Sequence, residues 1–185
     1  MWGFEFEHQV NLNFLPGFLK NFVLTYNGSI VRSETYVLSV DTFNVYVKQP
    51  TGFPPPYDSI TVPITNTRSV ERKQSLENQP RFYGNITLGY DIAGFSVRLS
   101  LFHQSEYNIS FSASGITDRI ANSFTRLDLA VKQQITDNFS VMLNLNNLTN
   151  TAESTSIVNR NQGWTLLTTS ERYGLTGNLG LRLTL

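Results

Sequence analysis

The 185-residue chain contains no cysteine and only two histidines, which excludes disulfide frameworks and thiolate metal sites. It has no run approaching the roughly 20 apolar residues of a membrane-spanning helix, and its mean hydropathy is −0.18. Neither sign of charge dominates, because 14 basic and 14 acidic residues cancel. Since binding to nucleic acid requires a positively charged face, no nucleic-acid partner is expected.

Motifs that carry catalysis are also missing from the sequence. It has no Gly-rich phosphate loop and no metal-ligand spacing. Combining Asp128 and His103 with a serine as a catalytic triad would be arbitrary, because nothing places these groups within hydrogen-bond reach. We therefore expect no catalytic residues, no cofactor and no metal, and predict that the protein is not an enzyme.

What the sequence does contain is strict alternation of apolar and polar residues. Between Phe4 and Phe14, apolar side chains occupy nearly every second position, with Glu5 and Glu7 among the residues between them. A period of two is typical of a β-strand and is incompatible with a helix. The same alternation predicts seven strands in all, at residues 4–14, 22–31, 81–90, 95–102, 125–132, 139–146 and 164–185.

The connections between these predicted strands alternate in length. Short turns are expected at residues 16–21, 91–94 and 135–138, and polar loops of about 47, 18 and 14 residues at about 33–79, 105–122 and 150–163. Prolines at 50, 54–56 and 63 exclude a central strand from the first loop. Residues 36–47 are nevertheless compatible with a hairpin arm.

Charged residues within the predicted strands all fall on the polar face. They are Glu5, Glu7, Arg81, Arg98, Arg126, Asp128, Lys132 and Arg182. Apolar residues facing lipid, charged residues facing a lumen, short periplasmic turns and long extracellular loops together are typical of an antiparallel up-and-down transmembrane β-barrel. The eight residues are therefore candidates for the lumen wall, either as ligand contacts or as a ladder of opposite charges.

Aromatic residues gather near the ends of the predicted short turns. They are Phe14, Phe22, Tyr90, Phe95 and Phe139, which suit an interfacial girdle as well as ordinary strand propensity. His8 departs from the pattern, since it lies among apolar neighbours near the middle of the first strand.

The predicted strands do not form a closed barrel by themselves. Single-chain bacterial barrels normally have an even number of strands, and an open edge in lipid leaves backbone amides without partners. The sequence also starts without a signal peptide. We therefore expect further strands to precede Met1, with residues 1–185 as the carboxy-terminal segment of a larger barrel.

Three stretches of sequence resemble TonB-dependent outer-membrane receptors. Residues 122–150, N-S-F-T-R-L-D-L-A-V-K-Q-Q-I-T-D-N-F-S-V-M-L-N-L-N-N-L-T-N, are similar to the late strands of that family, and residues 79–101 to the hairpin before them. The terminal E-R-Y-G-L-T-G-N-L-G-L-R-L-T-L resembles its final strand and sorting signal. Gly180, Leu183 and Leu185 are the candidate signal residues, although the family usually ends in Phe or Trp where this chain has Leu185.

The resemblance implies a 22-stranded barrel closed by an amino-terminal plug, of which this chain would supply about seven carboxy-terminal strands and no plug domain. It implies a location in the bacterial outer membrane and uptake of a scarce nutrient such as a siderophore, cobalamin or an oligosaccharide. The implied partners are outer-membrane lipid, the remaining strands and plug of the same protein, the TonB complex acting through that plug, and the barrel-assembly machinery.

Two other interpretations remain open at this point. One is a passive channel or structural barrel with an open lumen. The other is a soluble, carbohydrate-binding β-sandwich, which would bury Ile86, Leu127 and Leu143 together and leave Arg126 and Asp128 in bulk solvent. Burial of those apolar residues therefore separates the barrel from the sandwich.

Overall fold

The computed structural model describes residues 1–51 and 58–184. Leu185 and the prolines at 54–56 lie outside the described residues. All its sheets are antiparallel and no α-helix occurs in these ranges, so the predicted all-β class is confirmed. No helix in this part of the chain is long and apolar enough to cross a bilayer.

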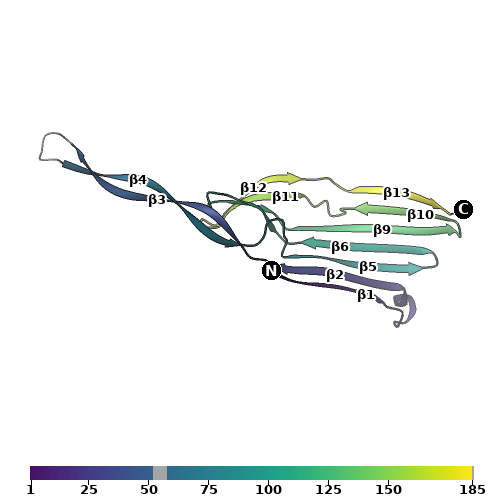
Figure 1. Ribbon diagram of the computed structural model, residues 1–185. Helices are drawn as coiled ribbons and strands as arrows, with labels where there is room; N and C mark the ends of the chain where they lie inside the picture. The colour runs from purple at the N-terminus through teal and green to yellow at the C-terminus, as the bar shows by residue number, and fades with distance from the viewer. Residues whose placement is uncertain (52–57, 185) are drawn as a thin grey trace.

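Seven strands form the main sheet, and each neighbour in the sheet is the next of these strands along the chain (Figure 1). The sheet is not closed into a barrel among the described residues. Its strands, in order, are β1 (Trp2–Asn11), β2 (Phe22–Arg32), β5 (Phe82–Ile92), β6 (Phe95–Gln104), β9 (Phe124–Thr136), β10 (Phe139–Asn146) and β13 (Thr176–Leu183).

The register of this sheet aligns the alternating patterns of all seven strands. Phe4 lies opposite Ile30, Ile86 opposite Leu101, and Leu143 opposite Leu179. Residues of like polarity therefore share one side of the sheet, because a strand projects alternate side chains to opposite faces. The apolar face comprises chiefly Phe4, Phe6, Val10, Leu24, Tyr26, Ile30, Ile86, Leu88, Tyr90, Val97, Leu99, Leu101, Leu127, Leu129, Val131, Val141, Leu143, Leu145, Leu179, Leu181 and Leu183.

Short connections lie at one end of the sheet. A 3₁₀ helix, η1 (Gly17–Asn21), joins β1 to β2, and two-residue turns join β5 to β6 and β9 to β10. Ala93 and Gly94 both have positive φ, at 47° and 79°, as in the mirror-image turns that match strand twist. The last two turns are tighter than the four residues predicted, since the strands extend further toward them.

A long hairpin leaves the opposite end of the sheet. Its strands are β3 (Thr35–Thr51) and β4 (Asp58–Gln74), and they pair only with each other (Figure 1, left). We call this hairpin the arm. It extends beyond the 36–47 segment predicted, and Pro63 is accommodated because each strand of a two-stranded ribbon is an edge strand.

A separate four-stranded sheet occupies the same end of the molecule. Its order is β12–β11–β8–β7, with β7 at Tyr107–Phe111, β8 at Asp118–Ala121, β11 at Glu153–Asn159 and β12 at Trp164–Glu171. The predictions that residues 105–122 and 150–163 are loops were therefore wrong. These strands are short and rich in polar residues, so they lack the alternation from which the others were predicted.

The prediction of one strand over residues 164–185 was also wrong. This segment contains β12 in the four-stranded sheet and β13 in the main sheet. Gly174, with φ of +74°, lies in the interruption between the two strands. Because a left-handed backbone conformation ends regular pairing, β12 and β13 can enter different sheets.

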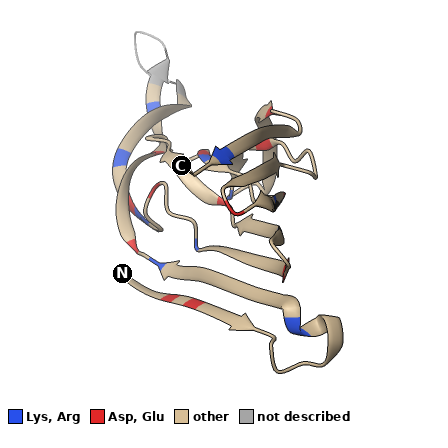
Figure 2. Cartoon of the chain, turned by 90° about the vertical axis from the view of Figure 1, so that its right-hand side faces the viewer, with Lys and Arg blue, Asp and Glu red and all other residues tan. Residues whose placement is uncertain are grey.

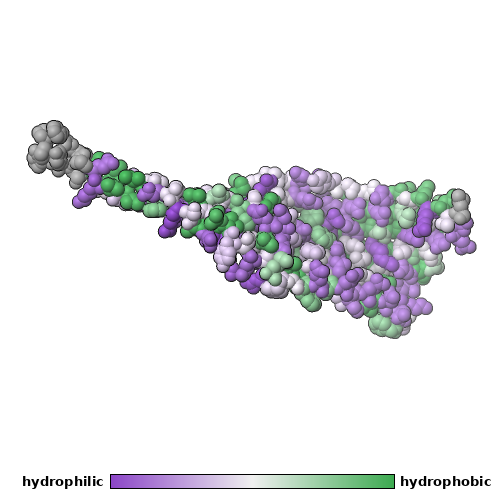
Figure 3. Space-filling view, in the orientation of Figure 1, coloured by the Kyte–Doolittle hydropathy of each residue, from purple (hydrophilic) through white to green (hydrophobic). Residues whose placement is uncertain are grey.

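Buried hydrophobic side chains are few among the described residues. Only Ile120 and Val158 qualify, and both belong to the four-stranded sheet. By contrast, Ile86 is 55% exposed and Leu179 is 69% exposed on the apolar face of the main sheet. Hydrophobic patches continue along the arm (Figure 3). Within residues 1–51 and 58–184, no apolar layer therefore packs against the main sheet.

Candidate functional site

The polar face of the main sheet carries the charged residues singled out from the sequence. Glu5 and Glu7 lie on β1, Arg98 on β6, and Arg182 on β13. Arg126, Asp128 and Lys132 lie on one face of β9 with Ala130 between the last two, and Arg81 immediately precedes β5. Basic and acidic residues are thus interspersed over the strands rather than gathered in one patch (Figure 2).

Two ion pairs lie on the polar face. Arg98 Nη2 is 2.7 Å from Asp91 Oδ2, and Arg126 Nε is 2.9 Å from Asp128 Oδ2. Arg98 therefore pairs with β5 rather than with the charges of β9. Asp128 Oδ1 also accepts a hydrogen bond from the backbone N–H of Asn147, at 2.8 Å. This carboxylate thus holds the chain where it leaves β10.

Four of the other candidate charges line two shallow hollows, whereas Arg81 borders a different one with Gln74, Ser75 and Gln79. Glu5 and Glu7 border a hollow of about 340 Å³ with Ser29, near the first edge of the sheet. Lys132 and Arg182 border a smaller one of about 190 Å³ at the short-turn end. The structure therefore separates the acidic pair on β1 from the basic pair on β9 and β13.

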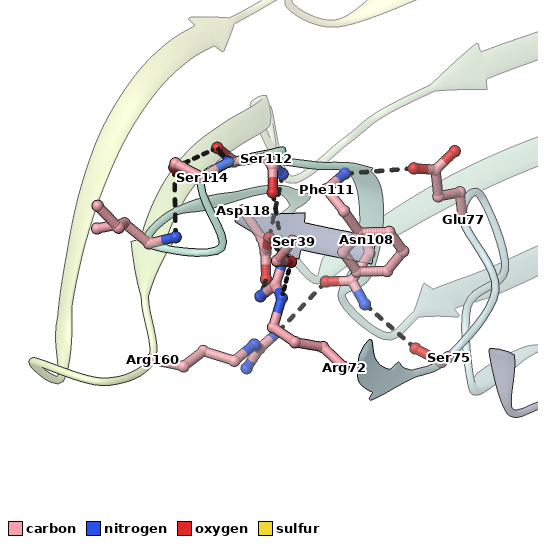
Figure 4. A network of polar contacts seen from close by, with 11 residues as sticks. Ser39, Arg72, Ser75, Glu77, Asn108, Phe111, Ser112, Ser114, Asp118 and Arg160 are labelled. Carbon is pink, nitrogen blue, oxygen red and sulfur yellow. Dashed lines mark hydrogen bonds and ion pairs between the residues drawn. The ribbon is translucent and has the colours of Figure 1, made fainter. Parts of the chain in front are cut away.

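A buried ion pair joins the base of the arm to the four-stranded sheet (Figure 4). Arg72 donates from both terminal nitrogens to Asp118, at 3.1 and 3.2 Å, and from Nε to Ser39 Oγ at 2.6 Å. The Asp118 carboxylate also accepts the backbone N–H of Ser112, at 3.3 Å. Asp118 is 3% exposed, so these donors replace the water it has lost.

Further hydrogen bonds extend this network across the three insertions, which are the long segments between strands of the main sheet at residues 33–81, 105–123 and 147–175 (Figure 4). Arg160 donates to Asn108 Oδ1 at 3.3 Å, and the Asn108 amide donates to Ser75 Oγ at 3.2 Å. Glu77 Oε1 accepts the backbone N–H of Phe111 at 3.2 Å. The four-stranded sheet and the arm base, residues 35–41 and 68–78, therefore form one connected unit, which we call the cap.

The network was not foreseen from the sequence. Arg72 and Asp118 are 46 positions apart, and both lie in segments predicted as loops. No spacing rule connects two residues that meet only because separate insertions fold against each other. The one local signal of a tight contact was the serine-rich S-A-S-G at residues 112–115. Gly115 has a φ of +70°, and a β-carbon at this position would lie only 2.9 Å from the Ser39 β-carbon.

A cleft of about 530 Å³ lies between the main sheet and the four-stranded sheet. On the main-sheet side lie Phe102, Phe124 and Arg126. The two rings are 6.4 Å apart, and the Arg126 guanidinium carbon is 5.9 Å from the centre of the Phe102 ring. Glu153 and Glu171 line the opposite side. The cleft is thus aromatic on one wall and acidic on the other.

Polar side chains surround these two glutamates. Thr155 and Thr169, which also line the cleft, share a hydroxyl contact of 2.7 Å across the hairpin. Tyr173 donates its hydroxyl hydrogen to Glu171, and this bond raises the pKa of Tyr173. From the sequence, Glu153 was predicted to lie in a loop, and no feature singled out Glu171.

The two residues weighed from the sequence as members of a triad do not meet. His103 and Asp128 project to opposite faces of the main sheet, and His103 Nδ1 lies 2.8 Å from Thr125 Oγ1. Within residues 1–51 and 58–184, no cluster of three or more His, Asp or Glu side chains is placed to hold a metal.

No family model matches the chain, and no curated protein or solved structure matches it significantly.

Proposed function

We propose that the chain forms part of the wall and the extracellular loops of a TonB-dependent outer-membrane receptor, which takes up a scarce nutrient. One observation supports this proposal above all others. The apolar face runs across all strands of the main sheet, and no second sheet or helix covers it within the described residues. In lipid such a face needs no protein partner, whereas in water it would be an aggregation site.

The burial of three apolar residues argues against the soluble sandwich. Ile86 is 55% exposed and Leu143 is 37% exposed, while Leu127 is only half-buried. They share no dry interior, and Arg126 and Asp128 on the other face are partly buried. Exposed apolar area costs about 25 cal/mol per Å², so a soluble protein would cover this face.

The lengths of the strands support a location in a lipid bilayer. A strand tilted by about 45° needs about 9–11 residues to cross the hydrocarbon core. The strands of the main sheet contain between 8 and 13 residues. Phe22 and Tyr90 make an edge-to-face contact at 4.9 Å near the short-turn end, where an interfacial girdle would lie.

The cap favours a receptor over a passive channel. A passive pore needs an open mouth, whereas selective uptake needs a structured surface that recognises its ligand. Here a buried ion pair joins the first two insertions, pairing of β11 with β8 joins the third to the second, and the last two border a defined cleft. In such a receptor, this chain would be joined by further strands that close the barrel, by a plug and by the TonB complex.

Gene deletion in the source organism tests the transport proposal. We expect removal of this chain's coding region to abolish uptake of one nutrient, and removal of the TonB complex to abolish uptake of the same nutrient. Loss of uptake in the first strain alone would establish the passive channel instead.

Membrane fractionation tests the location. The protein should remain with the outer-membrane fraction through high-salt and urea washes and should require detergent for extraction. Recovery as a monomer in detergent-free buffer would favour the soluble sandwich and contradict the proposal.

A further inference from the structure

The acidic wall of the cleft has an unfavourable arrangement in the absence of a ligand. Glu153 and Glu171 are directly opposed partners across the β11–β12 hairpin. Like charges directly opposite each other on adjacent strands repel and destabilise the pair. Both side chains are exposed toward the cleft, and no Lys or Arg of the described residues forms a salt bridge with either.

Three arginines lie close to these glutamates without forming a salt bridge with either, and one of them, Arg172, directly follows Glu171 in the chain. Arg126 lines the aromatic wall, but its Nε is engaged by Asp128 at 2.9 Å. Arg119 reaches Thr155 Oγ1, at 3.4 Å, and its ion-pair distance to both glutamates exceeds 4.0 Å. The cleft therefore presents two carboxylates that attract a cation from outside.

The apolar and aromatic lining of the cleft determines which other chemical groups a bound cation should have. Phe102 and Phe124 line the cleft from the main sheet, Tyr107 and Ile109 line it from β7 of the four-stranded sheet, and all four side chains are half-buried. Aromatic faces attract cations and also bury apolar groups. A volume of about 530 Å³ lies within the range of small-molecule pockets, about 300–1,000 Å³.

From these features we propose that the cleft binds an organic ammonium ion with an apolar body. The ammonium group donates hydrogen bonds to Glu153 and Glu171, and the apolar body packs against Phe102 and Phe124. This inference rests on the proposed uptake function, for which it names the chemical class of the ligand.

Titration calorimetry on the full chain in detergent micelles tests the proposal with three probes of similar size. They are 2-phenylethylammonium, its uncharged analogue 2-phenylethanol, and the anion 3-phenylpropanoate. The ammonium ion should bind saturably and at least about tenfold more tightly than the alcohol, and added salt should weaken it. Equal affinity for all three probes, or no saturable binding of the ammonium ion, would overturn the proposal.

Paired variants locate the binding. Glu153→Gln with Glu171→Gln should weaken ammonium binding by about tenfold or more while leaving the alcohol unchanged, since charge-assisted hydrogen bonds are lost. Asp137→Asn, which removes one negative charge in the turn between β9 and β10 and so matches Glu153→Gln alone, should have no effect. An unchanged affinity in the double variant contradicts the assignment. If that variant loses its β-sheet circular dichroism spectrum, Glu153→Gln alone serves, with at least a threefold loss expected and none as the contrary result.

The two proposals fail in different ways. Absence of ammonium binding in a chain that inserts into membranes overturns the cation site and leaves the receptor standing. Ammonium binding by a chain that stays soluble and never enters a membrane overturns the receptor and leaves the cation site.

Discussion

At the scale of single residues, the fold depends on a few polar side chains rather than on a hydrophobic core. Asp118 shows this most clearly, because it is 3% exposed and binds Arg72 through both carboxylate oxygens. Removing one member of a buried pair leaves the other charge desolvated and unpaired. The ion pair therefore attaches the arm to the four-stranded sheet. Its loss should destabilise the structure where these two elements meet.

Asp118→Ala should destabilise the cap by about 3 kcal/mol, near the lower limit for a buried pair because Arg72 is partly exposed. Hydrogen exchange of β7, β8 and the arm base measures this change. The control is Asp41→Ala, whose partner Arg68 is 64% exposed, with an expected cost below about 1 kcal/mol. Equal effects of the two substitutions would refute the role given to Asp118.

Leu143 and Asn144 offer a neighbouring pair on opposite faces of β10. Leu143→Arg places a cation on the apolar face and should cost about 2–4 kcal/mol in lipid near mid-membrane. Asn144→Arg places it on the polar face and should change the free energy of unfolding by less than about 0.5 kcal/mol. Denaturant unfolding from lipid vesicles measures both values, and similar costs would argue against lipid on one side.

At the scale of elements, the seven strands of the main sheet were largely predictable because their alternation is strict. Six were placed nearly as found, since an apolar face that must be continuous repeats every second residue. The cap strands could not be found in this way. In β8 and β11, polar residues face both sides, and pairing is set by contacts with distant insertions. The seventh strand was overextended across Gly174, where the chain passes from the four-stranded sheet to the main sheet.

The turn between β5 and β6 gives a test of local geometry. Ala93 has a φ of 47°, which asparagine tolerates better than alanine. Ala93→Asn should therefore raise the free energy of unfolding by about 0.5 kcal/mol, whereas Gly94→Ala, at φ of 79°, should lower it by about 1 kcal/mol. Denaturant midpoints in micelles would show the two opposite shifts, and shifts of the same sign would contradict the turn geometry.

The distal arm should be dispensable for the rest of the fold. Beyond Asp41 and Arg68, its strands pair only with each other. Replacing residues 43–66 by Asn-Gly should leave hydrogen exchange in the main sheet and around Asp118 unchanged. Faster exchange around Asp118 would show that the distal arm supports the cap.

At the scale of the whole molecule, the apolar face, the polar face and the cap each have a different chemical character. The apolar face suits contact with lipid, the polar face carries paired charges, and the cap provides the cleft. The sequence assigned the charged strand residues to the polar face of the main sheet, because alternation alone assigns a face; their place in a lumen wall stays a prediction. It did not foretell Glu153 and Glu171 as a facing pair, since that depends on the register of a hairpin with a bulge between Thr155 and Ser156.

Contact between the apolar face and acyl chains can be measured by fluorescence quenching. In a chain with Trp2 and Trp164 replaced by phenylalanine, a single tryptophan is introduced as Leu143→Trp or as Asn144→Trp, in vesicles of lipids brominated on their acyl chains. We predict strong quenching for Leu143→Trp and weak quenching for Asn144→Trp. Equal quenching at the two positions, or none at either, would contradict the account.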